Sequence, residues 1–161
     1  MSSTCEDTKS DSTHGTRLSN NHQAAEKLKD KGNTKLQSSQ DITGAIICYT
    51  QAIQLDDSNY IYFNNRAAAY ILLEEYDKAL SDCEYSLQLE ENARAHSRKA
   101  VIYSEWGYLE DAVVSVDRAI ELSQGDGGRA DEESAELKEF LTDTLQRAND
   151  YMTQGNELLE Q

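Results

Sequence analysis

Positively charged and amide side chains recur along the middle of the chain at spacings that suit the binding of a carboxylate. Lys29 and Asn33 stand four residues apart, so both project from one face of a helix. Arg94 and Arg98 repeat this spacing further on, and Asn65 lies between the two pairs. Arginine can fork onto one carboxylate, lysine supplies a point charge, and asparagine donates to either oxygen. The combination favours a peptide carboxylate over a phosphodiester chain.

The elements that must position these residues are amphipathic helices. Residues 60–91 carry apolar and small side chains at helical spacing on both sides of Glu74 and Glu75, which predicts a helical hairpin. A lone hairpin of this size cannot bury its own apolar faces, so similar units are expected beside it.

Small residues recur in step along the chain and mark such units. They form three series with steps of 33 to 35 residues: Ala45, Ala79 and Ala112; Ala52, Ser86 and Ala119; and Gly32, Ala67 and Ala100. Asn65 and Arg98 each lie two residues before a member of the third series, so they take the same place on stacked first helices. First helices line the inner surface of a curved repeat array. All five polar residues are therefore expected to converge in one groove.

This period and this pattern of small residues resemble the tetratricopeptide repeat. The resemblance implies an all-α fold of three tandem helical hairpins in a right-handed superhelix, followed by a long C-terminal helix. We expect a disordered tail over residues 1–22, a three-repeat domain over 23–123, a glycine-rich joint over 124–130 and a capping helix over 131–161.

The polar residues also lie in motifs similar to those of co-chaperone tetratricopeptide domains. The motifs are KDKGN with Lys29 and Asn33, NNRAAAY with Asn65, and RAHSRK with Arg94 and Arg98. The domains that they resemble, of the small glutamine-rich and stress-inducible type, grip the C-terminal EEVD of seventy- and ninety-kilodalton heat-shock chaperones in a two-carboxylate clamp. By this resemblance, the five residues bind the carboxylates of such a peptide.

The same resemblance places four apolar residues around the site. Leu36, Ala68 and Ile71 would border it and meet an apolar side chain of the ligand, and Leu72 occupies a groove position that is often lysine in the family. Arg94 also departs from the family, which usually has lysine there. The departure at Leu72 removes one anion contact and makes the groove more apolar.

Composition excludes several classes of function. The chain of 161 residues has a formal net charge of −15, which argues against nucleic acid and anionic membranes as partners. It has no apolar run long enough to cross a bilayer and no signal core at its N-terminus, so we expect a cytoplasmic protein. Cys48 and Cys83 lie on predicted helix faces without a CxxC pair, which predicts core packing rather than a metal site.

No nucleophile with a base, phosphate loop or cofactor motif is recognisable, so we expect no enzyme and no cofactor. The leading hypothesis is a monomeric adaptor that binds the C-terminal peptides of heat-shock chaperones. The alternative is a scaffold whose concave face binds an internal segment of a non-chaperone partner. Residues 131–161 hold nine acids against two bases, and the sequence leaves open whether they cap the array, dimerise or bind a client.

Overall fold

Helices make up all the regular structure in the described part of the chain. The computed structural model describes the backbone of residues 12–124 and 130–159, and the side chains of residues 19–123 and 134–150. The helices are α1 (Ser12–Ser39), α2 (Ile42–Leu55), α3 (Tyr60–Leu72), α4 (Tyr76–Leu89), α5 (Ala93–Glu105), α6 (Leu109–Gln124) and α7 (Ala130–Leu159). The prediction of an all-α fold is confirmed.

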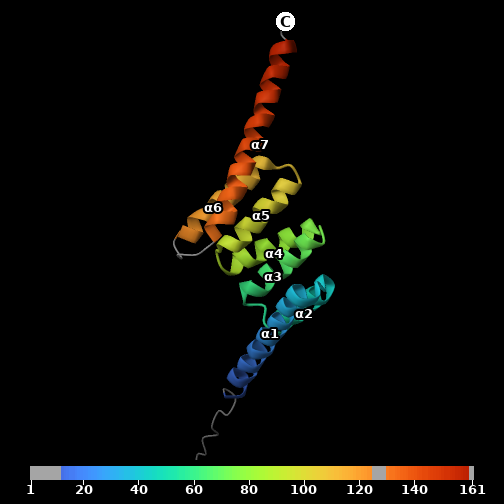
Figure 1. The fold of residues 1–161 in the computed structure, drawn as a ribbon. Helices are drawn as coiled ribbons and strands as arrows, with labels where there is room; N and C mark the ends of the chain where they lie inside the picture. Colours follow the sequence, from blue (N-terminus) through green and yellow to red (C-terminus); the bar gives the residue numbers. More distant parts are fainter. Residues whose placement is uncertain (1–11, 125–129, 160–161) are drawn as a thin grey trace, which may run out of the picture.

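Consecutive helices pair into three hairpins. Helices α1 and α2, α3 and α4, and α5 and α6 pack against each other, and the hairpins follow one another along the molecule (Figure 1). Helices α1, α3 and α5 also contact one another in sequence, so the first helix of each hairpin shares one side of the array. Helix α7 packs against α6 and α5, and its C-terminal part projects beyond the hairpins (Figure 1).

The small residues that define the repeat lie where these helices pack against one another. All nine members of the three series are buried, and the eight that carry a side chain are 0% exposed. Short side chains let two helices approach closely, and larger ones such as Tyr49, Tyr62 and Ile102 fill the remaining interior. Cys48 and Cys83 are buried free thiols, as predicted, and burial raises the pKa of Cys83 to about 12.

Polar side chains cap the first helices of the second and third hairpins. The side chain of Asn59 accepts from the backbone N–H of Ile61 at 3.0 Å, and that of Asn92 accepts from Ala95 at 2.9 Å. Each cap fixes where the first helix of a repeat begins.

The three hairpin turns share one backbone feature. Gln40, Glu74 and Gly107 each have a positive φ, of 50°, 58° and 78°, in the turn between the two helices of a hairpin. Only glycine adopts this left-handed conformation without steric cost. The first two hairpins therefore carry a small strain that the third does not.

The N-terminal boundary of the first helix differs from the expectation. Helix α1 begins at Ser12, whereas the sequence placed residues 1–22 in a disordered tail; residues 1–11 lie outside the described residues. Once a helix has formed, each further residue adds one hydrogen bond at little cost, so it can continue through a polar segment. His22 also contacts the Asp56 carboxylate, at 2.7 Å, just after α2.

Helix α7 packs on the hairpins through apolar side chains on one face. Leu141 is fully buried and Leu137 is partly buried against Val116 of α6, whereas Phe140 on the other face is exposed. The expected joint falls largely on residues 125–129, which lie outside the described residues. No described helix combines the length and apolarity needed to cross a membrane.

Candidate functional site

Lys29 and Asn33 lie one turn apart on α1, and Gly32 holds this helix close to α2. A Cβ atom at Gly32 would stand 2.6 Å from Cε1 of the Tyr49 ring, so glycine is required for this approach. The Tyr49 hydroxyl then donates to Asn33 Oδ1 at 2.7 Å. Close packing of the two helices therefore fixes the position of the Asn33 amide.

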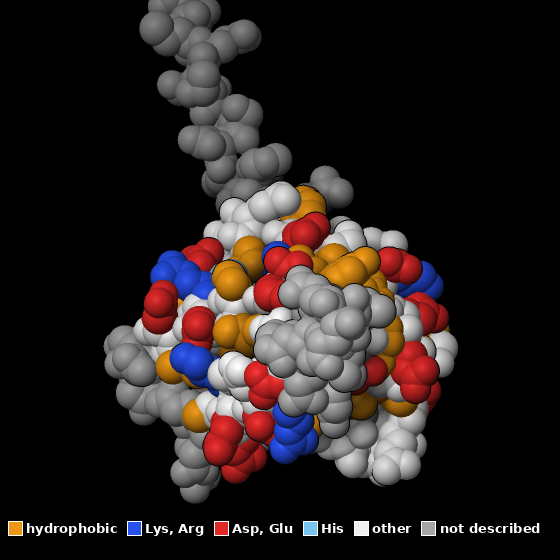
Figure 2. Space-filling model, turned by 90° about the horizontal axis from the view of Figure 1, so that it is seen from above, with side chains coloured by type: hydrophobic (Ala, Val, Ile, Leu, Met, Phe, Trp, Pro, Cys, Tyr) orange, Lys and Arg blue, Asp and Glu red, His pale blue; other side chains and the backbone are white. Residues whose placement is uncertain are grey.

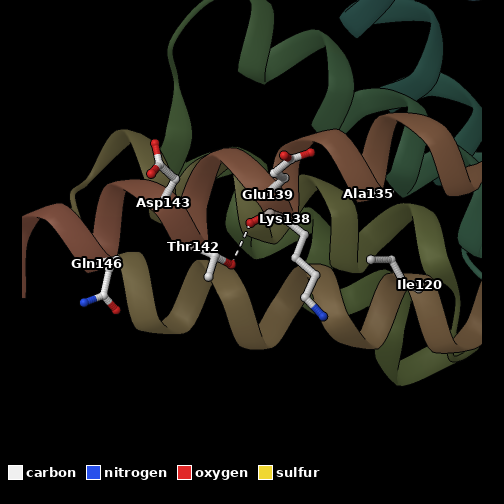
Figure 3. A pocket seen from close by; sticks show the side chains of 7 residues that line it. All are labelled: Ile120, Ala135, Lys138, Glu139, Thr142, Asp143 and Gln146. Atoms are coloured by element: carbon white, nitrogen blue, oxygen red, sulfur yellow. Dashed lines mark hydrogen bonds between the residues drawn. The ribbon is translucent and has the colours of Figure 1, made fainter.

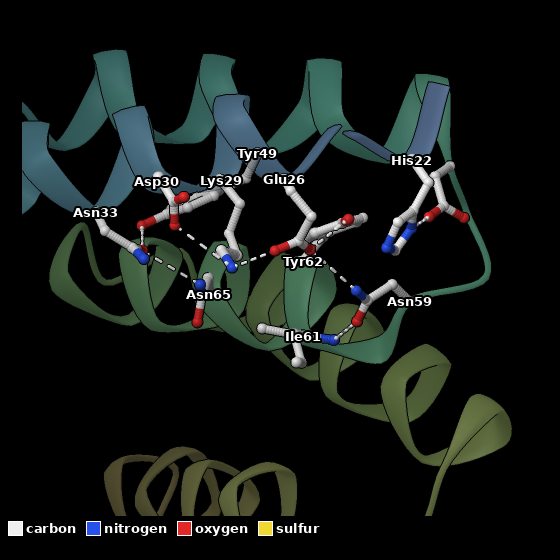
Figure 4. Close-up of polar contacts among 11 residues, drawn as sticks. His22, Glu26, Lys29, Asp30, Asn33, Tyr49, Asn59, Ile61, Tyr62 and Asn65 are labelled. Carbon is white, nitrogen blue, oxygen red and sulfur yellow. Dashed lines mark hydrogen bonds and ion pairs between the residues drawn. The ribbon is translucent and has the colours of Figure 1, made fainter. Parts of the chain in front are cut away.

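The second inner helix, α3, adds Asn65 to the same place. Its Nδ2 donates to Asn33 Oδ1 at 3.2 Å, so the two amides expected to converge from neighbouring repeats are in direct contact (Figure 4). Because Asn33 Oδ1 accepts from both Tyr49 and Asn65, the Nδ2 group of Asn33 is directed away from them. No acceptor among the described residues contacts that group, so it is available to a ligand oxygen.

Lys29 lies beside these amides but is already engaged. Its Nζ donates to Glu26 Oε2 at 2.6 Å and lies 3.4 Å from Asp30 Oδ1 (Figure 4). The hydrogen bond to Glu26 is the main cause that raises the pKa of Lys29, against an opposing effect of burial. Lys29 is therefore a firmly protonated ammonium that is held by the protein's own acids.

The two arginines come from the third inner helix, α5. Arg98 is half-buried, and its Nη1 donates to the backbone carbonyl of Arg94 at 3.2 Å, whereas Arg94 is exposed. Burial is the main cause that lowers the pKa of the Arg98 guanidinium, which stays charged at neutral pH. Within the described residues neither arginine pairs with a carboxylate. A partly desolvated cation without an acid is costly unless an anion is supplied.

Tyr49 joins the amides through its hydroxyl. Burial raises the pKa of Tyr49 to about 12, and the positive charge of Arg98 opposes that rise. The same hydroxyl contacts Asn33. The structure thus brings Lys29, Asn33 and Asn65 together (Figure 4), whereas no contact among the described residues joins Arg94 or Arg98 to these amides.

The four apolar positions differ in exposure. Leu36 packs against the cluster of Ala45, Tyr49 and Ala69, and Ile71 packs against the neighbouring cluster around Ala67. Ala68 is half-buried, whereas Leu72 at the end of α3 is 61% exposed. Leu72 is therefore the position with the most apolar surface left to offer a ligand.

Two residues that contact the site, Tyr49 and Glu26, were not expected there from the sequence. Tyr49 was not among the residues expected at the site, yet its hydroxyl orients Asn33. Glu26 was not considered, although its spacing of three residues before Lys29 is typical of an ion pair on a helix. Spacing could have suggested the Glu26–Lys29 pair, whereas nothing in the sequence indicated the direction of the Tyr49 hydroxyl.

A separate open groove lies between α6 and α7. It has a volume of about 570 Å³ and is lined by Ile120, Ala135, Lys138, Glu139, Thr142, Asp143 and Gln146 (Figure 3). Lys138 pairs there with Asp117 at 2.5 Å. The site residues lie on α1, α3 and α5, so this groove is not part of the carboxylate site.

Two further observations limit the chemistry of the surface. In the view from above, basic side chains stand singly among acidic and hydrophobic ones on the described surface (Figure 2). Within the described ranges no three His, Cys, Asp or Glu side chains gather in a group that could hold a metal ion. The chain as a whole is acidic, with 30 Asp and Glu against 15 Lys and Arg.

The chain matches known proteins in sequence and in fold. Residues 93–126 match the tetratricopeptide repeat family. A small glutamine-rich tetratricopeptide repeat-containing protein of Dictyostelium discoideum is 38% identical over 99 residues, which are 61% of this chain and 29% of that protein. The matches to this and two further curated relatives span less than a third of those proteins' lengths.

Solved structures with bound peptides share the fold. The first TPR of Spaghetti (RPAP3), bound to the HSP90 peptide SRMEEVD, has a TM-score of 0.71 and 29% identity; the match covers 77% of this chain and 97% of that one. The second TPR domain of human RPAP3, in complex with the HSP70 peptide SGPTIEEVD, has a TM-score of 0.66 and 25% identity, with coverage of 76% and 98%.

Proposed function

Because this chain is a tetratricopeptide-repeat protein, we propose that it is an adaptor that binds the C-terminal EEVD-type peptide of heat-shock chaperones of the 70-kDa or 90-kDa class. Lys29, Asn33, Asn65, Arg94 and Arg98 form the two-carboxylate clamp. The peptide lies along the inner helices α1, α3 and α5, with its apolar side chain against Leu36, Ala68, Ile71 and Leu72.

One observation carries the proposal. Arg98 is half-buried without a carboxylate partner among the described residues, on a chain with 30 acids and 15 bases. Such a cation needs an external anion, and the amide group of Asn33 on α1 has no acceptor among the described residues. The peptides bound by the two RPAP3 domains both end in EEVD, which supports an aspartate end as that anion.

Titration with paired peptides tests the proposal. SRMEEVD and SGPTIEEVD are each prepared as the free acid and as the C-terminal amide, and binding is measured by calorimetry at two salt concentrations. The free acids should bind, amidation should weaken binding by about tenfold or more, and added salt should weaken it further. Equal binding of both forms would contradict a carboxylate clamp.

A second candidate function rests on the exposure of Leu72 and the engagement of Lys29. If the groove holds an internal segment of a non-chaperone partner, apolar contacts would dominate and no free carboxylate would be needed. Substituting Leu36 or Leu72 by alanine would then weaken partner binding more than Arg98→Ala. The reverse order supports the chaperone clamp.

A further inference from the structure

We propose that Glu26 sets the affinity of the carboxylate site by occupying Lys29 as an internal competitor of the ligand. The inference rests on the proposed function, because it concerns the same site. Glu26 lies on α1 one turn before Lys29, and its Oε2 accepts from Lys29 Nζ at 2.6 Å. A peptide carboxylate would seek this same ammonium group.

Glu26 is held in place independently of Lys29. Its other oxygen, Oε1, accepts from the hydroxyl of Tyr62 at 2.7 Å and from Nδ2 of Asn59 at 3.3 Å (Figure 4). The Tyr62 side chain is fully buried, and Asn59 is fixed as the N-cap of α3. The carboxylate therefore does not swing into solvent when a ligand arrives, as an exposed acid on a flexible side chain would.

An incoming carboxylate meets an ammonium group that is already neutralised. Asp30 lies 3.4 Å from the same Nζ, so a bound peptide would place a third carboxylate around one lysine. The like charges repel one another at a site that is only partly exposed, and the repulsion opposes binding. The lysine end of the clamp is therefore occupied in the unliganded protein, whereas the arginine end on α5 is open.

Replacing Glu26 by glutamine removes the competing charge with little other change. The variant Glu26→Gln keeps an oxygen that can accept from Tyr62 and Asn59, and it places an amide nitrogen where Oε2 accepted from Lys29. Glu121→Gln is the matched control, since it makes the same change of charge at an exposed residue of α6 that pairs with Arg118. Asp30→Asn is a second test at a side chain that is 70% exposed and need not affect folding.

Calorimetric titration with the free-acid peptide SRMEEVD measures the effect. We expect Glu26→Gln to tighten binding by about fivefold and Asp30→Asn by about twofold, with no change for Glu121→Gln. The double variant Glu26→Gln with Lys29→Met should bind no more tightly than Lys29→Met alone, since the effect acts through Lys29. A thermal melt of each variant verifies that it folds.

The outcomes separate this inference from the proposed function. If the wild type binds the free acid better than the amide, but neither Glu26→Gln nor Asp30→Asn binds more tightly, the inference fails and the function stands. If no variant binds either peptide, both fail. If the wild type binds the free-acid peptide weakly and Glu26→Gln binds it measurably more tightly, the result supports both the inference and the proposed function.

Discussion

The hydroxyl of Tyr49 and the side-chain oxygen of Asn33 lie 2.7 Å apart, and the hydrogen bond between them joins a fully buried ring to the candidate peptide site. The ring packs against Gly32, so the contact depends on the close approach of α1 and α2. The orientation of Asn33 is therefore set by the core rather than by solvent.

Tyr49→Phe tests this connection. Loss of the hydroxyl should weaken binding of the free-acid peptide about threefold, because Asn33 keeps only Asn65 as a donor to Oδ1, and should cost about 1 kcal/mol of unfolding free energy. Tyr85→Phe is the control, since Tyr85 is partly exposed and stacks on Phe63. Calorimetry and urea denaturation measure both effects; wild-type affinity in Tyr49→Phe would show that Asn33 does not need this anchor.

The two arginines should differ in importance. Arg98→Ala should weaken peptide binding by about tenfold or more, and exposed Arg94→Ala by about threefold, because a screened surface charge contributes less than a half-buried one. Arg147→Ala is the control: it pairs with Asp143 on α7, away from the inner helices. A larger loss in Arg94→Ala than in Arg98→Ala would reverse the assignment of the principal cation.

Arg66 joins three helices and should be important for stability. From α3 it donates through Nε and Nη2 to Asp82 of α4, at 2.8 and 2.7 Å, and through Nη1 to Thr50 of α2, at 3.1 Å. Asp82→Ala would leave this cation partly buried and unpaired, so the unfolding free energy should fall by about 2–4 kcal/mol. Glu75→Gln, in the exposed pair with Lys78, should give no measurable change in the same denaturation experiment.

The left-handed turns offer a stabilising substitution. Glu74→Gly should raise the unfolding free energy by about 1 kcal/mol because it relieves a positive φ, and Gly107→Ala in the next repeat should lower it by a similar amount. Glu74→Gln keeps the strain while removing the charge, and should behave like the wild type. Destabilisation by Glu74→Gly would mean that the Glu74 side chain makes a compensating contact.

Acid should weaken the junction between the second and third repeats. Glu91 accepts from Arg118 and contacts His96, each at 3.0 Å, and the contact with His96 followed by that with Arg118 lowers the pKa of Glu91. A carboxyl with a lowered folded-state pKa stabilises above its unfolded pKa of about 4.3, and this contribution is lost as the pH falls through the folded value. The difference in unfolding free energy between wild type and Glu91→Gln should therefore be largest above about pH 5 and shrink below it. Denaturation series at several pH values measure it; a difference that grows in acid would contradict the sign.

Much of the fold could be predicted because it depends on spacing. The nine small residues recur in steps of 33 to 35 residues, which predicts stacked hairpins, and all nine are buried. The cap at Asn92 was also predictable, because an asparagine side chain just before a helix accepts from a backbone N–H of its first turn. The start of α1 at Ser12 was not, because a polar segment carries no signal of burial that separates a continuing helix from a tail.

The candidate site was predictable only in part. Register between repeats is enough to expect that Asn33 and Asn65 meet, and they do. The contact of Glu26 with Tyr62 depends on how α1 and α3 cross and on the rotamers of both side chains, which spacing along one helix does not determine. The sequence therefore could not predict whether the Lys29 ammonium group is free to bind a ligand or is held by Glu26.

Alanine is the commonest residue at the buried contacts between the helices of this array, and alanine has no side-chain torsions to rearrange. Helices that meet through such residues have few alternative packings, so the inner surface is expected to keep one shape with or without a peptide. Most of the entropy lost on association would then come from the ligand as it becomes extended, and the length and stiffness of the tail would set the strength of the complex.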